Sequence, residues 1–184
     1  MSPQRTLNPK VGSAQPLEAF FESAQCSDLA AFEAEHGSGF LIVTAASVDN
    51  AKSDNTQLLL ADLDEQEVGG RTADLSVVVY ALSASTAQAG HLVTVGRDPK
   101  HDLVIPDASV SRFHAYMKRV EDGTYAVQDM ASTNGTTVNG VNAPARGAGP
   151  PSPVKPGDTI RFGQVQLTFT DARALREFVL QAAG

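Results

Sequence analysis

The sequence predicts a mainly β fold, a two-sheet antiparallel β-sandwich with an N-terminal helix and hairpin segment and a C-terminal helix. From about residue 75 onward, short runs of apolar and β-branched residues follow one another. Turn residues separate these runs, for example Asp122-Gly123, Asn134-Gly135 and Asn139-Gly140. Many short strands at regular spacing are typical of a sandwich or a barrel.

The chain before the sandwich divides into two segments. Residues 1–15 are rich in Pro, Ser, Asn, Gln and Gly, which predicts a flexible tail. Residues 16–72 are expected to form an accessory segment. Its apolar residues recur at helical spacing from 17 to 34 and predict one helix of about 18 residues, either continuous or broken near Cys26-Ser27-Asp28, where Ser27 or Asp28 could cap a second turn.

Two apolar runs in this accessory segment, residues 40–44 and 57–61, are separated by residues of turn composition. They form a candidate β-hairpin. Residues 62–73 are acidic and contain glycine, which suits a linker or an exposed loop.

The sandwich itself is expected to span residues 73–171, and residues 147–156, rich in Pro and Gly, are expected to form a surface loop within it. The final segment, 172–184, is predicted to be a helix capped by Asp171, with an apolar stripe of Leu175, Phe178, Val179 and Leu180. The expected strands are 76–82, 91–96, 102–105, 114–120, 124–130, 136–138, 159–162 and 165–170.

Composition limits the classes of function. The net charge of −7, without any run of Lys and Arg, argues against a nucleic-acid partner, because neutralising phosphates requires the opposite sign. Cys26 is the only cysteine, so neither an intrachain disulfide nor a thiolate metal cluster can form. Residues 1–15 lack the apolar core of a secretory signal, and no run approaches the roughly 20 apolar residues that span a bilayer. We therefore expect a cytoplasmic protein without a membrane span.

Residues 96–135 contain the polar and charged groups from which a function can be predicted. They contain Gly96-Arg97, the run 111–114 (SRFH), Asp129 and the turn 132–135 (STNG) in that order. An Arg fork, hydroxyl groups and loop N–H groups can hold the oxygens of a phosphate. No nucleophile is paired with a base, Cys26 lies in a helical stretch, and a P-loop pattern is missing. These groups predict a site that holds a phosphate ester and not an enzyme that cleaves one.

The order and spacing of these pieces, together with VNG at 138–140 and GDTIRFG at 157–163, resemble the forkhead-associated (FHA) domain family, a phosphothreonine-binding β-sandwich. The resemblance covers roughly residues 75–171. It implies no cofactor and no metal.

The resemblance also implies roles for individual residues. Two guanidinium groups and a serine hydroxyl are expected at the phosphate, a threonine near the phosphate or the ligand's γ-methyl group, and an asparagine on the peptide backbone. These phosphopeptide-binding residues are Arg97, Arg112, Ser111, Thr133 and Asn134. Structural roles fall to Gly96, His114 and Gly135, and Asp129 is expected to support the binding loops.

The function implied is an adaptor or regulator that reads phosphothreonine in bacterial Ser/Thr kinase signalling. Its partner would be a phosphothreonine-containing protein, such as a Ser/Thr kinase or its substrate. The alternative is a structural scaffold or interaction domain that works through residues 1–72, either by covering one sheet or by self-association. Burial of Arg97, Ser111 and Asn134 against that segment would favour the scaffold. A further hypothesis is that phosphorylated Thr6 in the tail blocks the site in cis.

Overall fold

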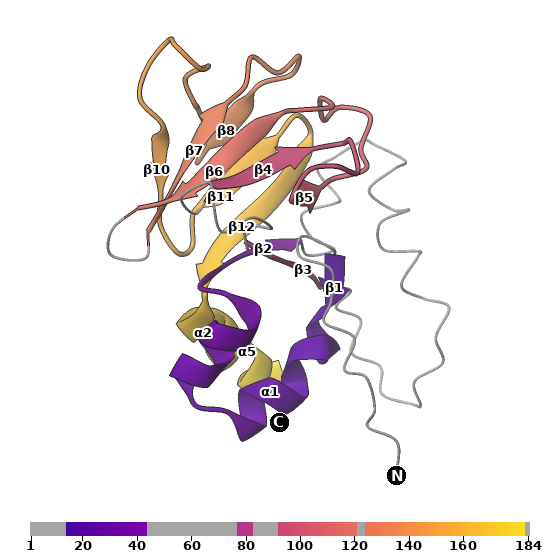
Figure 1. Cartoon of the computed structure of the whole chain (residues 1–184), viewed down its shortest axis with the longest axis vertical. Coiled ribbons are helices and arrows are strands. Elements are labelled where there is room, and N and C mark those ends of the chain that lie inside the picture. The colour runs from indigo at the N-terminus through magenta and orange to yellow at the C-terminus, as the bar shows by residue number, and fades with distance from the viewer. Residues whose placement is uncertain (1–13, 44–76, 83–91, 121–123, 183–184) are drawn as a thin grey trace.

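The computed structural model describes residues 14–43, 77–82, 92–120 and 124–182. They form two β-sheets packed face to face, with helices gathered at one end beside β1, β2 and β3 (Figure 1). The larger sheet has the strand order β1 (Ala14–Pro16), β3 (Val78–Ala81), β2 (Gly39–Val43), β12 (Val165–Asp171), β11 (Thr159–Phe162), β8 (Thr136–Val138) and β9 (Val141–Asn142). The smaller sheet has the order β10 (Ser152–Val154), β7 (Tyr125–Asp129), β6 (Ala115–Arg119), β4 (Leu92–Gly96) and β5 (Leu103–Val104).

This architecture confirms the predicted sandwich. Every named strand pair is antiparallel except β4 with β5, which run parallel. Strands β8 and β11 have the predicted bounds, and the other predicted strands begin and end within two residues of their predicted positions. Alternation explains the agreement, because inward positions such as Val165, Leu167 and Phe169 on β12 are buried in the core between the sheets.

A second apolar cluster lies on the outer face of the larger sheet, beneath the helices. It includes Phe20, Phe32 and Phe40, together with Leu175 and Val179 of the C-terminal helix, all fully buried. Both faces of β2 are therefore covered, since its Leu41 and Val43 belong to the core between the sheets. A strand buried on both faces reads as a continuous apolar run, as residues 40–43 do.

The sequence predicted a hairpin in which residues 40–44 pair with residues 57–61. This partner is wrong for residues 40–43, which belong to β2. Strand β2 pairs on one edge with β3, where Ile42 lies opposite Val79, and on the other with β12, where Ile42 lies opposite Thr168. No edge is left for a hairpin partner. Residues 57–61 themselves, like 62–73, lie outside the described residues. The accessory segment thus contributes an internal strand to the sandwich.

Two other segments differ from the sequence-based expectation. Residues 14 and 15, assigned to the tail, belong to β1 at the edge of the larger sheet. The loop 147–156 contains β10, which pairs with β7 and buries Val154. The Pro and Gly content of this segment predicted a loop. Pro153 lacks an N–H group, but β10 is an edge strand, where that loss is tolerated.

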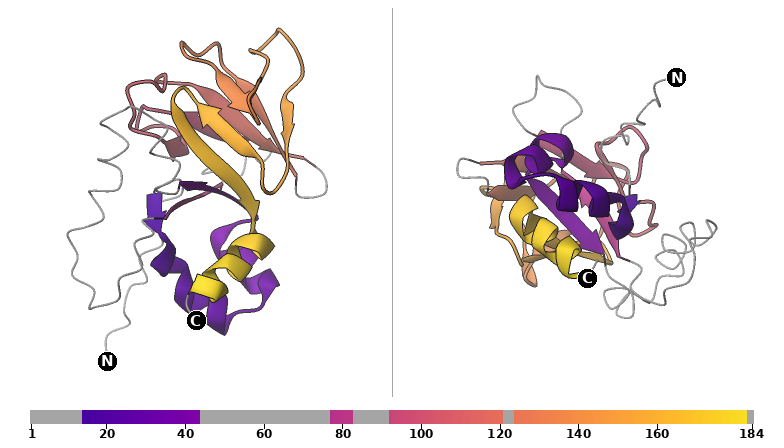
Figure 2. Two further views of the ribbon diagram at one scale, coloured as in Figure 1. Left: turned by 180° about the vertical axis from the view of Figure 1, so that it is seen from behind. Right: turned by 90° about the horizontal axis from the view of Figure 1, so that it is seen from below.

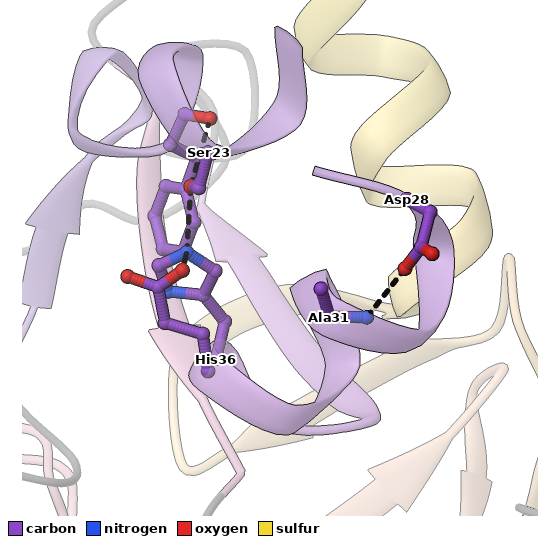
Figure 3. A network of polar contacts seen from close by, with 6 residues as sticks. Ser23, Asp28, Ala31 and His36 are labelled. Atoms are coloured by element: carbon purple, nitrogen blue, oxygen red, sulfur yellow. Dashed lines mark hydrogen bonds and ion pairs between the residues drawn. The ribbon is translucent and has the colours of Figure 1, made fainter. Parts of the chain in front are cut away.

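The N-terminal helical segment is broken at Ser27 and Asp28, the second of the two expected alternatives. A 3-10 turn, η1 (Leu17–Phe20), leads into α1 (Phe21–Cys26), and α2 (Leu29–His36) follows after Ser27 and Asp28. Asp28 caps α2, since its side chain accepts a hydrogen bond from the N–H of Ala31 at 2.8 Å (Figure 3). The Ser23 hydroxyl and His36 Nε2, 2.7 Å apart, join α1 to α2 (Figure 3).

The C-terminal helix α5 (Ala172–Ala182) packs beside α1 and α2 (Figure 2). Its predicted cap is confirmed, because Asp171 Oδ1 accepts from the N–H of Ala174 at 2.8 Å. Leu175 and Val179 are buried, whereas Phe178 and Leu180 remain partly exposed, so the apolar stripe is narrower than predicted. Arg176 anchors the helix by donating from Nη2 to the carbonyl oxygen of Ser27 at 2.9 Å.

Candidate functional site

The loops that follow β4, β5 and β7 form the candidate site, and the loops after β4 and β7 lie away from the helices (Figure 1). These loops line an open pocket with a volume of about 500 Å³. All five predicted binding residues line it, from three separate loops: Arg97, Ser111, Arg112, Thr133 and Asn134. The remaining lining residues are Ala108, Ser109, Val110 and Phe113.

Two exposed guanidinium groups give the pocket its charge. Arg97 and Arg112 are both exposed, and neither forms an ion pair with any residue of the described ranges. Their loops are joined by backbone hydrogen bonds, from the N–H of Arg97 to the Ser111 carbonyl at 3.0 Å and from the N–H of Asp98 to the Arg112 carbonyl at 3.3 Å. Two cations are therefore presented to solvent by loops that are hydrogen-bonded to each other.

Gly96 allows the two arginine loops to approach this closely. A Cβ atom at this position would clash with the carbonyl oxygen of Arg112 and lie 2.6 Å from Cδ2 of His101. A larger residue would push the loops apart. Gly96 thus occupies a position that agrees with its predicted structural role.

The polar wall of the pocket is formed where the loop after β5 meets the turn after β7. The Ser111 hydroxyl oxygen accepts a hydrogen bond from the N–H of Thr133 at 3.1 Å, and the two hydroxyl groups are 3.5 Å apart. Asn134 Nδ2 donates to the carbonyl oxygen of Ser109 at 2.8 Å. Three polar side chains from two loops are thereby held next to one another at the surface.

His114 is fully buried beneath this wall and connects both loops. Its Nδ1 accepts from the N–H of Ser111 at 3.0 Å, so the proton resides on Nε2, which donates to the carbonyl oxygen of Gly135 at 3.1 Å. Burial lowers the pKa of His114, although the bond to Gly135 and the charge of Asp129 act in the opposite direction. The ring is a neutral connector without contact with solvent.

Asp129 organises the turn that carries Thr133 and Asn134. Its Oδ1 accepts from the hydroxyl groups of Ser132 at 2.6 Å and Thr136 at 2.7 Å, and its Oδ2 accepts from the N–H of Ser132 at 2.9 Å. Burial alone would raise the pKa of Asp129, but these hydrogen bonds hold it below its ordinary value. At neutral pH the carboxylate is a charged acceptor, which strengthens the bonds it receives.

The sequence did not identify Ala108, Ser109, Val110 and Phe113 as pocket residues. Ser109 has a clear local role, since its hydroxyl donates to Asp107 Oδ1 at 2.6 Å and accepts from the N–H of Gln164 at 2.9 Å. Residues 108–110 directly precede the run 111–114 and Phe113 lies within it, and this proximity was a usable signal. Their orientation depends on the path of the loop, which the sequence does not specify.

Within the described ranges, none of the helices is long and apolar enough to cross a membrane. The same ranges contain no group of three or more His, Cys, Asp or Glu residues placed to hold a metal ion.

Comparison with known proteins identifies the class. Residues 93–163 match the model of the FHA domain family, so this part of the chain is an FHA domain. The chain is 36% identical over 78 residues to an oxoglutarate dehydrogenase inhibitor of Corynebacterium diphtheriae, a match that covers 42% of this chain and 50% of that protein. It is 37% identical over 76 residues to the glycogen accumulation regulator GarA of Mycolicibacterium smegmatis, covering 41% and 44%.

Similarity therefore extends over about half the length of these curated relatives, or less. Among solved structures, the FHA domain of a Chlamydia trachomatis protein aligns with a TM-score of 0.44 and 21% identity, covering 72% of this chain and 97% of that one.

Proposed function

We propose that this chain is a phosphopeptide-binding module that reads phosphothreonine on a partner protein. One observation carries the proposal: the five residues implied by the sequence motifs line a single open pocket in an FHA domain. Ser111 is partly exposed and the other four are exposed. A phosphate on an extended peptide could therefore reach them without rearrangement of the core.

The chemistry of the pocket suits a phosphate dianion. A phosphothreonine carries close to two negative charges at pH 7, because its second pKa is about 6. Arg97 and Arg112 supply the opposite charge, and each charge-assisted hydrogen bond contributes about 1.5–3 kcal/mol. Binding should weaken as the pH falls through about 6, where the ligand loses half a charge.

Selectivity for phosphothreonine over phosphoserine depends on one methyl group. Its burial stabilises the complex by about 1 kcal/mol, and by up to about 3 kcal/mol in a tight pocket. Thr133, held against Ser111, is the residue we place beside that methyl group or beside the phosphate.

The relatives support a regulatory role. They are named as an inhibitor of oxoglutarate dehydrogenase and as a regulator of glycogen accumulation. We accordingly place this chain among bacterial adaptors or regulators in Ser/Thr kinase signalling, with a kinase or a kinase substrate as its partner. It binds the phosphate ester and performs no catalysis.

The scaffold alternative finds support in a different part of the structure. Residues 14–43 supply two strands of the larger sheet and the helices that, together with α5, cover its outer face. That coverage leaves the pocket open, since no residue of this segment lines it. Covering one sheet and binding a phosphopeptide are therefore compatible roles for different parts of one molecule.

Titration of the full chain with one peptide in its phosphothreonine, phosphoserine and unphosphorylated forms tests the proposal. A degenerate library with a fixed central residue supplies the peptide. We expect measurable affinity for the phosphothreonine form, affinity about 5- to 150-fold lower for phosphoserine, and none for the unphosphorylated form. Equal binding of all three would overturn the proposal. Release of inorganic phosphate during the incubation would instead indicate an enzyme.

A further inference from the structure

The turn between β11 and β12, formed by Gly163 and Gln164, contacts two of the loops that build the pocket. Neither residue lines the pocket itself. The N–H of Gly163 donates to the carbonyl oxygen of Gly135 at 3.0 Å, and the N–H of Gln164 donates to the hydroxyl oxygen of Ser109 at 2.9 Å. The turn is therefore hydrogen-bonded both to the loop after β5 and to the loop after β7.

Ser109 is held from two sides. Its hydroxyl group donates to Asp107 Oδ1 at 2.6 Å, and its N–H donates to the same oxygen at 2.7 Å. From the other side Gly163 packs against it, because a Cβ atom at Gly163 would lie 2.5 Å from the Ser109 carbonyl oxygen and 2.8 Å from its hydroxyl oxygen. The position of the Ser109 carbonyl group is thus defined by hydrogen bonds and by close packing.

This carbonyl group in turn holds the side chain of Asn134. Its oxygen accepts from Asn134 Nδ2 at 2.8 Å. Asn134 is exposed, and an exposed side chain that nothing holds exchanges between rotamers. The bond uses one of the two Nδ2 hydrogens, so the other hydrogen and Oδ1 keep their capacity to bond a ligand. A side chain fixed in advance loses less conformational entropy when the ligand binds.

We infer that Ser109 is a positioning residue, through which the turn 163–164 orients the amide of Asn134 for the main chain of the phosphopeptide. The inference rests on the proposed function, in which Asn134 contacts the peptide backbone while Arg97 and Arg112 contact the phosphate. Ser109 acts on the peptide through Asn134. A change in the turn, outside the pocket, therefore alters the affinity for the ligand by moving the Ser109 carbonyl group.

A double-mutant cycle between Ser109→Ala and Asn134→Ala tests the inference. The phosphothreonine peptide selected from the degenerate library is titrated against wild type, the two single variants and the double variant. Ser38→Ala is the matched control, since Ser38 Oγ lies 3.4 Å from the Tyr125 hydroxyl oxygen and Ser38 does not line the pocket. Thermal unfolding of each variant confirms that it is folded.

Ser109→Ala should weaken binding about 2- to 12-fold, the net contribution of one hydrogen bond, and Ser38→Ala should bind as wild type does. Asn134→Ala should weaken binding at least as much as Ser109→Ala. In the Asn134→Ala background, Ser109→Ala should have no further effect, because the amide that Ser109 orients is gone. Additive losses in the double variant, or wild-type affinity in Ser109→Ala, would overturn the inference.

Gly163→Ala alters the same contact from the side of the turn. The added Cβ atom would displace the Ser109 carbonyl group, so the affinity should fall by a similar factor. Gly157→Ala is the control, because Gly157 also has positive φ, 92° against 62° at Gly163, but a Cβ atom there would have no neighbour within 4 Å. Both variants strain the backbone. Equal phosphopeptide affinity in the two variants would contradict a role for the turn.

A measurement without ligand separates positioning from a general loosening of the fold. The side-chain amide resonances of Asn134 in a heteronuclear NMR spectrum are assigned by their loss in Asn134→Ala. They should shift in Ser109→Ala and Gly163→Ala and keep their positions in Ser38→Ala and Gly157→Ala. Unchanged resonances in Ser109→Ala would overturn the inference. Equal binding of the phosphorylated and unphosphorylated peptide by wild type would instead refute phosphate recognition, and the inference with it.

Discussion

The hydroxyl oxygen of Ser111 accepts a hydrogen bond from the backbone N–H of Thr133 at 3.1 Å, which joins the two loops at the polar wall of the pocket. The same hydroxyl is a predicted phosphate contact. Ser111 therefore positions the loop that carries Thr133 and Asn134 by accepting from Thr133, and its O–H group is predicted to donate to the phosphate. Substitution of the residues that support this wall, such as His114 and Asp129, should therefore change the affinity for the phosphopeptide.

Replacing His114 should disconnect the two loops. In His114→Phe the partly buried N–H of Ser111 loses its acceptor, which should lower the free energy of unfolding by about 1–3 kcal/mol. Phosphopeptide affinity should fall as the wall loosens. His114→Gln can still accept and donate and should recover part of both. Urea unfolding and peptide titration measure the two effects, and equal affinity in wild type and His114→Phe would contradict the assigned role.

Stability should fall as the pH drops below about 6.5. Burial lowers the pKa of His114 in the folded chain from its ordinary 6.5, so the unfolded chain takes up a proton first. The contribution of the neutral ring is complete above 6.5 and is lost as the pH falls toward the folded pKa. The pKa of His36 is lowered by burial too, with Glu35 opposing, so His36 has the same effect.

Urea unfolding at several pH values between about 5 and 8 measures this dependence. His114→Gln should reduce the slope of stability against pH, and a second variant, His36→Gln, should reduce it separately. A slope unchanged in both variants would show that neither histidine is buried in its neutral form.

Asp129 should affect binding as well as stability. Asp129→Asn replaces an acceptor oxygen by an amide group that faces donors, which should cost about 1–3 kcal/mol of stability and loosen the turn 132–135. Asp158→Asn is the matched control. Asp158 accepts from Asn139 Nδ2 at 2.9 Å and from the N–H of Lys155 at 2.7 Å, away from the pocket. The Asp158→Asn variant should lose stability and keep the wild-type affinity for the phosphopeptide. Parallel losses of affinity in both variants would argue against a specific role for Asp129.

Gly135 and Gly140 form a second matched pair. Both have positive φ, 76° and 80°, and a Cβ atom at either position would have no neighbour within 4 Å. Each substitution to alanine should therefore cost about 1–2 kcal/mol from backbone strain alone. Gly135 accepts from His114 and turns the chain beside Asn134, so only Gly135→Ala should also weaken phosphopeptide binding. Equal affinities in the two variants would contradict this.

The sequence predicted the sandwich well because the information there is local. Alternating burial in β12 and the turns at Asn134-Gly135 and Asn139-Gly140 specify strands and their ends without reference to distant residues. It predicted the wrong partner for residues 40–43, because their partners, Val78–Ala81 and Val165–Asp171, are remote in sequence. Pairing between such segments depends on the whole sandwich.

The candidate site was likewise predictable only where local motifs mark its residues. Arg97, Ser111, Arg112, Thr133 and Asn134 were predictable because motifs mark them, and the structure brings all five to one pocket. The stack of Phe113 on His101 could not be predicted, since it depends on how two loops approach each other over Gly96. Aromatic contacts between loops leave no periodic signal in the sequence.

The most direct test of phosphate recognition is the affinity of a phosphothreonine peptide for wild type, Arg97→Ala and Arg161→Ala. Arg161 is exposed on β11 and does not line the pocket, so both variants change the net charge equally. We predict that Arg97→Ala weakens binding about 10- to 100-fold, the loss of one charge-assisted contact, while Arg161→Ala binds as wild type does. Equal affinity of Arg97→Ala and wild type, or equal weakening by both variants, would contradict phosphate recognition at this pocket.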